Sequence, residues 1–401
     1  MRKTMQCIAA VCALALLSGC SGGSLYSNYR ELEQLMVIQT MGFDTAPSGF
    51  LLSVSSGSGS GGGGSSSDSS GSGGGSGQSG SSKVARLSAE AESLVLAQNT
   101  IQDYSASEQL FFAHTSYIAL GSEAAYKSVT PFLDYIERST TLRLDTPLFV
   151  VSGGKAADLV LGAGGQDYDA TSVLKSLERN LDLRGDCVVY STSEIVASID
   201  TNGCALICAI KCANADESVK DAMPEELTAL PDGYAVIKNG RMIGHIPFDV
   251  ARGVNIIQNQ VGPSSVVVYS DGKKATVQLD KCSCDIKPKF KGKKLEGLDI
   301  KIKLSAALAE ADSEADTKKL GKALSKEAKR WVTSVMESSR TLSCDFMQLG
   351  STLERAEPKK LKGAGASFSE QLGDIYYNVS VDATVDRSFD LSSGGAKQNE
   401  N

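Results

Sequence analysis

Short apolar stretches alternate with amphipathic ones in the first half of the chain. A β-hairpin is predicted by MVIQTMGFD and FLLSVSS, which flank a turn at TAPSG. A helix is expected from Ser88 to about Gln102, followed by one buried strand at EQLFFAHTSYIALG. Another strand at PLFVVSG precedes helices at GKAADLVLG and DATSVLKSLERNL. This alternation of strands and helices predicts a mixed α/β domain.

Strand patterns dominate the second half. We interpret VVYSTSEIVASIDTNGCALICAIKC as strands and the polar stretch after it as a loop. Two hairpins are predicted around Asn239-Gly240 and Asp271-Gly272, because these residue types tolerate positive φ. We expect PFDVARG to form one helical turn. A long amphipathic helix at 312–343 and a closing strand at DIYYNVSVDATVDRSF complete the pattern.

The expected fold is of the α+β class: three mixed α/β domains with mostly antiparallel sheets, preceded by a lipoprotein signal peptide. The run SGSGSGGGGSSSDSSGSGGGSGQSGSS contains no apolar residue, so it predicts a disordered insert rather than core. The expected division is a signal peptide at 1–19, a lipidated tether at 20–34, an N-terminal domain at 35–165 with the insert at 57–82, a middle domain at 166–225, a C-terminal domain at 226–390 and a disordered tail at 391–401.

The first twenty residues have the pattern of an exported lipoprotein. Arg2 and Lys3 precede an apolar run that is too short for a transmembrane span. The run ends in Leu-Ser-Gly followed by Cys20, which is similar to a lipobox in which the thiol accepts a lipid. An ordinary secretory signal with an incidental cysteine is the alternative. The prediction is a chain anchored through lipidated Cys20 to the outer face of the cytoplasmic membrane.

The formal net charge of −7 argues against nucleic acid as a partner, because nucleic acids favour a basic face. One basic cluster stands at 287–303, where lysines on a strand edge discourage sheet-to-sheet pairing. Attraction of this cluster to anionic lipid headgroups is a weaker alternative.

No motif for catalysis or cofactor binding is found in the sequence. His114 and His245 are its two histidines, and structural roles are favoured for both. Asp44, Asp134 and Glu137 are interpreted as ordinary carboxylates rather than as an acid–base set. We therefore expect no enzyme activity, no cofactor and no metal.

Seven cysteines remain once Cys7, Cys12 and Cys20 are set aside. A strand period of two places Cys204, Cys208 and Cys212 on one buried face, where thiols behave as small hydrophobes. Zinc is not favoured, because no CxxC pair with partner histidines is present. One disulfide from this strand to Cys282 or Cys284 is a minor alternative.

Five stretches in order resemble the Ger(x)C family, the lipoprotein C subunits of spore germinant receptors. They are YRELEQLMVIQTMGFD (29–44), FFAHTSYIALGSEAA (111–125), RSTTLRLDTPLFVVSGGKAADLVLG (138–162), GYAVIKNGRMIGHIPFDVARGVNII (233–257) and CDFMQLGSTLERAEP (344–358). Each stretch is weak alone, but the ordered set together with the lipobox is fairly specific.

The resemblance implies a non-catalytic subunit at the outer face of the spore inner membrane. Its implied partners are a receptor A subunit and a transporter-like B subunit, and any contact with a small-molecule germinant could be indirect. The segments Val236–Ile246 and Arg252–Asn255 are candidates for domain interfaces, although ordinary core roles are favoured. A solute-binding lipoprotein of a membrane importer is the alternative function. That function predicts two similar lobes, and the sequence shows no such repeat.

Overall fold

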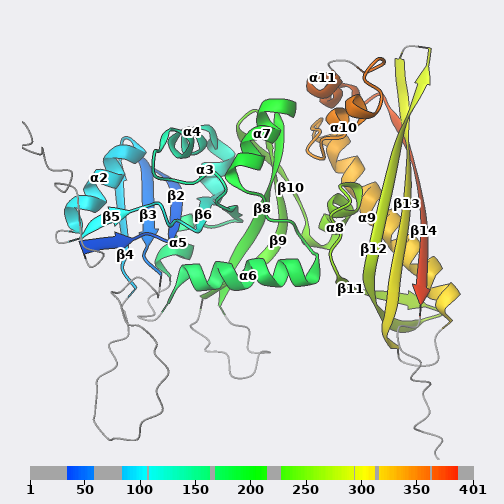
Figure 1. Ribbon diagram of the computed structural model, residues 1–401, viewed down its shortest axis with the longest axis horizontal. Coiled ribbons are helices and arrows are strands. Elements are labelled where there is room, and N and C mark those ends of the chain that lie inside the picture. Colours follow the sequence, from blue (N-terminus) through cyan, green and yellow to red (C-terminus); the bar gives the residue numbers. More distant parts are fainter. Residues whose placement is uncertain are drawn as a thin grey trace, which may run out of the picture.

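The computed structural model describes residues 34–57, 84–105, 108–162, 168–214, 227–292, 294–311, 316–361 and 364–386. It is an elongated molecule with one large sheet toward its N-terminal end and a second sheet at the other end (Figure 1). The predicted signal peptide and the tail lie outside the described residues. So do the tether apart from Gln34 and the insert apart from Gly57.

The larger sheet has eight strands and is mixed. Its four central strands run parallel to one another, and antiparallel strands extend it on both sides. In spatial order the strands are β10 (Arg241–Ile246), β9 (Leu227–Lys238), β8 (Cys204–Asn214), β7 (Leu148–Val151), β6 (Tyr117–Gly121), β2 (Thr40–Ala46), β3 (Gly49–Ser55) and β4 (Arg86–Ala91). A short parallel pair, β1 (Leu35–Val37) and β5 (Gln109–Phe111), lies beside it.

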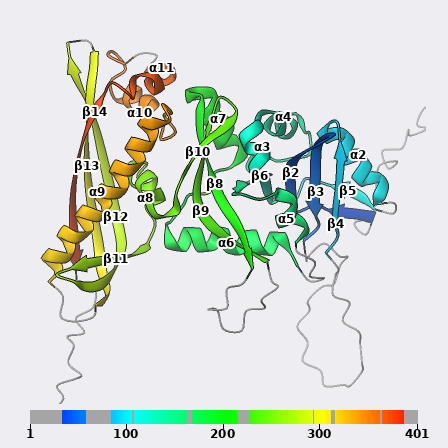
Figure 2. The same cartoon turned by 180° about the vertical axis from the view of Figure 1, so that it is seen from behind.

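Helices cover both faces of this sheet (Figure 2). On one face, apolar side chains form a core with α2 (Leu94–Tyr104), α3 (Ser122–Lys127), α4 (Thr130–Arg138) and α7 (Thr192–Asn202). On the opposite face, the core includes α5 (Ala156–Leu161), α6 (Ala170–Arg184) and α8 (Phe248–Ile257). The alternation within β8 divides its side chains between the two cores, as a strand period of two requires.

The second sheet has four strands in the order β11 (Ser264–Ser270), β12 (Lys273–Lys291), β13 (Lys294–Ala311) and β14 (Tyr376–Asp386). One face packs against the long helix α9 (Thr317–Thr341), through apolar residues such as Leu324, Trp331 and Val335. The short helices α10 (Leu349–Ala356) and α11 (Ala364–Gln371) follow α9. The four-stranded sheet with α9, α10 and α11 is called the C-terminal unit below.

Several local predictions are confirmed. The Asn239-Gly240 and Asp271-Gly272 turns have positive φ at all four residues and connect β9 to β10 and β11 to β12. The predicted α+β class is also confirmed. Most strand pairs are antiparallel, as predicted, although the four central strands make the large sheet mixed. Within the part of the chain that the structure describes, no helix is long and apolar enough to cross a membrane.

Other local predictions are wrong where long-range pairing or a missed cap decides the conformation. The helix expected from Ser88 begins after Ser93, because residues 86–91 pair with β3 instead. The single strand expected at 108–121 is split into β5 and β6 by a turn, in which Thr115 Oγ1 donates a hydrogen bond to Phe112 O. Residues 192–202 form α7 rather than a strand, and the expected single turn at PFDVARG is the ten-residue α8.

The large sheet also crosses the boundaries expected at 165/166 and 225/226. Strands β8 and β9 pair with each other, and β8 continues onto β7 from the N-terminal part. Residues on both sides of each boundary therefore share backbone hydrogen bonds. The division into three domains stays a prediction.

Candidate functional site

The predicted lipid site, Cys20, lies outside the described residues, so its lipidation stays a prediction. The candidates within the described residues are the two histidines, the three carboxylates, the cysteines and the two predicted interface segments.

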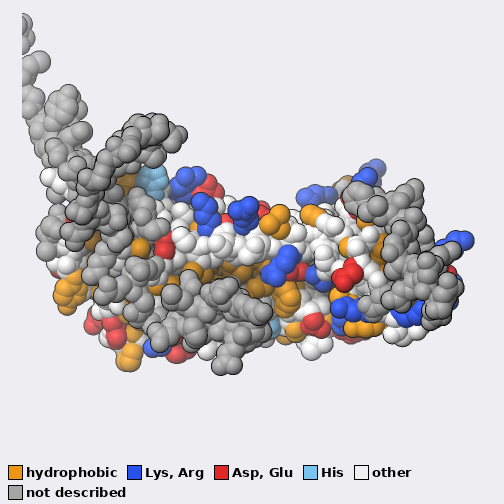
Figure 3. Space-filling view, turned by 90° about the horizontal axis from the view of Figure 1, so that it is seen from below, with side chains coloured by type: hydrophobic (Ala, Val, Ile, Leu, Met, Phe, Trp, Pro, Cys, Tyr) orange, Lys and Arg blue, Asp and Glu red, His pale blue; other side chains and the backbone are white. Residues whose placement is uncertain are grey.

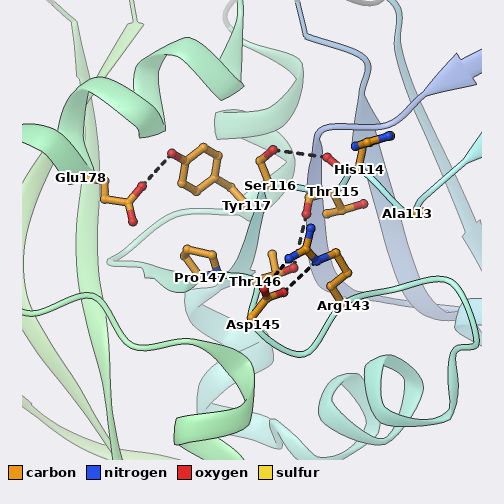
Figure 4. Close-up of a pocket in the computed structure, with 10 residues that line it drawn as sticks. All are labelled: Ala113, His114, Thr115, Ser116, Tyr117, Arg143, Asp145, Thr146, Pro147 and Glu178. Atoms are coloured by element: carbon orange, nitrogen blue, oxygen red, sulfur yellow. Dashed lines mark hydrogen bonds and ion pairs between the residues drawn. The ribbon is translucent and has the colours of Figure 1, made fainter.

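His114 lines a pocket of about 310 Å³, which opens where β6 and β7 begin (Figure 4). The charged groups of the pocket are already paired. Arg143 Nε donates to Asp145 Oδ1 at 3.0 Å, and Tyr117 Oη donates to Glu178 Oε2 at 2.7 Å. The imidazole of His114 lies on the other side of the pocket from Glu178 and contacts the ring of Phe111.

This pocket offers little for catalysis. Ser116 Oγ donates to the backbone carbonyl oxygen of His114 rather than to its ring, so the two side chains do not form a nucleophile–base pair. The pocket also lies at the amino ends of parallel strands, whereas ligands of open α/β sheets bind at the carboxyl ends.

The second histidine stabilises a hairpin. His245 Nε2 lies 2.5 Å from the backbone oxygen of Asp232 and 3.3 Å from its Oδ2. Both residues belong to the β9–β10 hairpin, so this contact fixes local geometry. Within the described residues, no group of three or more metal-ligating side chains is present.

The three carboxylates do not form one site, because each has different surroundings. Asp44 is 3% exposed, and its two oxygens accept hydrogen bonds from Ala156 N and Ala157 N at 2.9 and 2.8 Å. It therefore binds the amino end of α5, and burial raises its pKa. Asp134 pairs with Arg138 one helical turn later on the exposed face of α4. Glu137 is on the same short helix and is exposed, whereas Asp44 is buried.

The cysteines of β8 do face one core, as the strand period predicts. Their thiol neighbours differ from the expected ones, however. Cys208 lies beside Cys187, and Cys204 lies beside Cys344. The expected alternatives Cys282 and Cys284 lie on β12, where Cys282 Sγ approaches Ile256 O instead. The reason is topological: β12 belongs to a different sheet, separated from β8 by α8 and α9.

The two predicted interface segments meet the C-terminal unit directly. In the segment Arg252–Asn255, Arg252 forms an ion pair with Asp186, and its guanidinium lies 5.7 Å from the ring centroid of Trp331 on α9. Asn255 Nδ2 donates to the backbone oxygens of Gly185 and Asp186 at 3.1 and 3.2 Å. These contacts connect the end of α6 to α8 and α9.

Buried Tyr234 completes this network. Its hydroxyl donates to Asn255 Oδ1 and accepts from Val188 N, both at 2.6 Å. Complete burial raises the pKa of Tyr234 well above its usual value, so the phenol stays protonated and available as a donor.

The second segment, the β9–β10 hairpin, contacts the residues that follow α9. Lys238 Nζ donates to Ser343 O at 2.7 Å, and Cys344 Sγ lies 3.9 Å from Ile237 O. Gly244 is close to Leu342, since a Cβ there would be 2.8 Å from Leu342 Cδ1. We call α8, the β9–β10 hairpin and residues 342–345 together the junction.

Sequence reasoning missed Tyr234 and Asp345, which belong to the junction, and Asp186, which pairs with it through Arg252. Asp345 is fully buried, and its two oxygens accept from Leu349 N and Gly350 N at 2.8 Å each. Burial raises its pKa to about 7, although the two backbone donors oppose that shift. A local signal was available only for Asp345, because an Asp before an apolar turn is a common helix-start residue.

Two families of known proteins match the sequence, one over each part of the chain. Residues 28–211 match the family described as the spore germination protein N-terminal domain. Residues 232–389 match the family described as spore germination B3/GerAC like, C-terminal. No curated protein sequence matches the chain.

Among solved structures, the crystal structure of the GerBC protein has the same fold. It superposes with a TM-score of 0.56 at 16% identity, covering 86% of this chain and 96% of that one. The resemblance to the Ger(x)C family found in the sequence is thus confirmed over both parts of the chain. The chain belongs to the GerAC-like family of spore germination proteins.

Proposed function

We propose that this chain is the non-catalytic, lipid-anchored C subunit of a nutrient germinant receptor, acting to promote spore germination at the outer face of the spore inner membrane. The observation that carries the proposal is the ordered pair of family matches over residues 28–211 and 232–389. The fold shared with the GerBC protein supports it.

In this proposal, Cys20 carries the lipid, and the chain assembles with a receptor A subunit and a transporter-like B subunit. The junction supports a role in relaying contacts rather than in chemistry. Its buried polar groups are used in holding α6, α8, α9 and the β9–β10 hairpin together. Any effect of a germinant on this chain would then pass through its partners.

One feature of the fold favours this function over a solute-binding lipoprotein of an importer. Two similar lobes are expected of such a lipoprotein, whereas the two large sheets here differ in strand number and order. Acidic and basic side chains are also interspersed on the face seen in Figure 3, including the part over the C-terminal unit. A nucleic-acid partner is correspondingly disfavoured.

Capture from spore membranes tests the proposal. The chain carries a C-terminal tag, dormant-spore inner membranes are solubilised in mild detergent, and co-purifying proteins are identified. We expect two multi-span membrane proteins, one of them similar to amino-acid transporters. Recovery of an importer permease, or of no membrane protein, would contradict the proposal.

The anchor is tested separately with Cys20→Ala. This variant should leave the membrane fraction and lose incorporation of labelled palmitate. Cys12→Ala is the matched control, because Cys12 lies in the apolar run of the same predicted signal peptide. The control should keep both the membrane location and the label, and a membrane-bound, labelled Cys20→Ala protein would exclude Cys20 as the lipid site.

A further inference from the structure

Two buried thiols meet where the large sheet touches the C-terminal unit. Cys204 begins β8 and is 1% exposed, whereas Cys344 lies between α9 and α10 and is fully buried. The two residues are far apart in the chain. Cys204 belongs to the large sheet, whereas Cys344 lies in the C-terminal unit. A bond between them would therefore join the two halves of the molecule.

Both thiols lie beside the same short piece of β9. Cys204 is the register partner of Lys238, and Ala205 is the partner of Ile237. The sulfur of Cys344 lies 3.9 Å from Ile237 O. The two side chains are thus held over adjacent positions of β9.

Ser369 provides an independent measure of this proximity. Its hydroxyl lies 3.8 Å from Cys204 Sγ, and the same oxygen accepts Asp345 N at 3.0 Å. Asp345 directly follows Cys344 in the chain. One hydroxyl therefore touches the first cysteine and the backbone next to the second.

The surroundings distinguish the two thiols. The pKa of Cys204 is lowered to about 7, mainly because Cys344 donates a hydrogen bond to its thiolate, with further contributions from Ser369 and the charge of Lys238. The same coupling raises the pKa of Cys344. Cys204 is therefore the better nucleophile at neutral pH, since the thiolate is the reactive form.

We propose that Cys204 and Cys344 form a disulfide that fastens the large sheet to the C-terminal unit. The oxidant is a small or protein disulfide. The Cys204 thiolate attacks one of its sulfurs, which forms a mixed disulfide and releases one thiol. The Cys344 sulfur then attacks the Cys204 sulfur, closes the new S–S bond and releases the second thiol.

This sequence transfers two electrons from the cysteine pair to the oxidant, and the two thiol protons end on the two released thiols. Because both sulfurs are buried in the folded chain, the exchange takes place as the junction closes during folding, when the two thiols already lie side by side and the oxidant still reaches Cys204. The inference does not depend on the proposed function, since it rests on the contacts of the junction alone.

The remaining cysteines are weaker candidates. Cys208 also has a thiol neighbour, Cys187, but burial and that neighbour raise its pKa well above the usual value, which suppresses its thiolate. Burial raises the pKa of Cys212 and Cys282 to about 11. A disulfide between Cys204 and Cys344 would also close a long loop of the chain, which stabilises the folded state strongly.

The test is refolding of the full chain in a glutathione redox buffer, followed by alkylation of free thiols, digestion without reductant and mass spectrometry. We expect a linked peptide pair containing Cys204 and Cys344, which disappears after reduction. The thermal midpoint of the oxidised chain should exceed that of the reduced chain by roughly 5–10 °C. Alkylation of both cysteines as free thiols, or a link from either to another cysteine, would overturn the proposal.

Matched variants assign the shift in thermal midpoint. Cys344→Ser should abolish the difference between oxidised and reduced protein, whereas Cys212→Ser, on the same strand as Cys204, should preserve it. If Cys344→Ser fails to fold, the peptide map of the unmodified chain still decides the question. An unchanged difference in a folded Cys344→Ser protein would contradict the assignment.

Discussion

Arg252 on α8 forms an ion pair with Asp186, a carboxylate that is only 4% exposed in its side chain. Arg184 Nε lies 3.2 Å from the other oxygen of the same carboxylate. One buried acid therefore holds the end of α6 and the start of the junction together through two guanidinium groups. Breaking such a pair from one side leaves charge without a partner in a region of low polarity.

We expect Asp186→Asn to reduce the free energy of unfolding by about 3 kcal/mol, because Arg252 then loses its carboxylate. Chemical denaturation followed by far-UV circular dichroism measures this. Asp145→Asn is the control: it removes the partner of Arg143 at the surface, where both side chains are more than half exposed. The control should behave as the unmodified protein, and equal losses in the two variants would refute the special role of Asp186.

Gly253 allows α8 and α9 to approach closely. A Cβ there would lie 2.6 Å from the backbone oxygen of Trp331, so Gly253→Ala must force the helices apart. We expect a loss of about 2 kcal/mol or more, as is typical of overpacking in a core. Thermal unfolding provides the measurement. Gly373→Ala, at a site where a Cβ would meet no atom within 4 Å, should leave the midpoint almost unchanged.

Asp44 and Gly121 form a second site with little space. A Cβ on Gly121 would overlap Asp44 Oδ1, so the glycine leaves room for the carboxylate that binds α5. Asp44→Ala should destabilise the chain by about 2 kcal/mol, because Ala156 N and Ala157 N lose their acceptor while buried. Asp134→Ala, on exposed α4, is the comparison. A stability loss no larger than that of Asp134→Ala would show that water replaces the carboxylate.

Asp345 should make the free energy of unfolding decrease as the pH rises, which is the opposite of the usual effect of a carboxylate. Burial raises its folded-state pKa to about 7 from 3.8, so the folded chain binds its proton more tightly than the unfolded chain does. Its contribution to the free energy of unfolding therefore decreases as pH rises from about 4 to about 7, by a few kcal/mol. Denaturation of the unmodified chain and of Asp345→Asn at pH 5 and pH 7.5 isolates this contribution.

The stability difference between the two proteins should change with pH in that sense, favouring the aspartate at the lower pH. A difference that is constant across this range would show that the two backbone hydrogen bonds to Asp345 outweigh its burial.

We expect the predicted insert to tolerate shortening without loss of the fold. Its ends are fixed beside each other, since Ser56 N donates to Ala85 O at 3.0 Å and Ala85 N donates to Ser56 Oγ at 3.0 Å. Replacing residues 58–82 by an Asn-Gly turn should therefore keep β3 and β4 paired. We expect the thermal midpoint to change by less than about 2 °C, because loop length affects stability weakly. A large fall in the midpoint would contradict this.

Sequence patterns predicted the conformation correctly where it depends on local signals. The Asn239-Gly240 turn and the amphipathic face of α9 depend on neighbours a few residues away, so their conformations were predictable. The helix at 192–202 was missed although Ser191 and Glu194 form a capping box at its start. Its β-branched residues favoured a strand when they were considered without that cap.

What the sequence by itself determined is thus the class of the fold, most of the strands and helices and the family, whereas export through the first twenty residues stays a prediction. Only the tertiary structure decided that residues 86–91 pair with β3 and that β8 joins the two predicted domains in one sheet. It also decided which thiol meets Cys204 and which carboxylate meets Arg252. These contacts join residues far apart in the chain, and their partners are fixed by the packing of α8 and α9 rather than by local propensity.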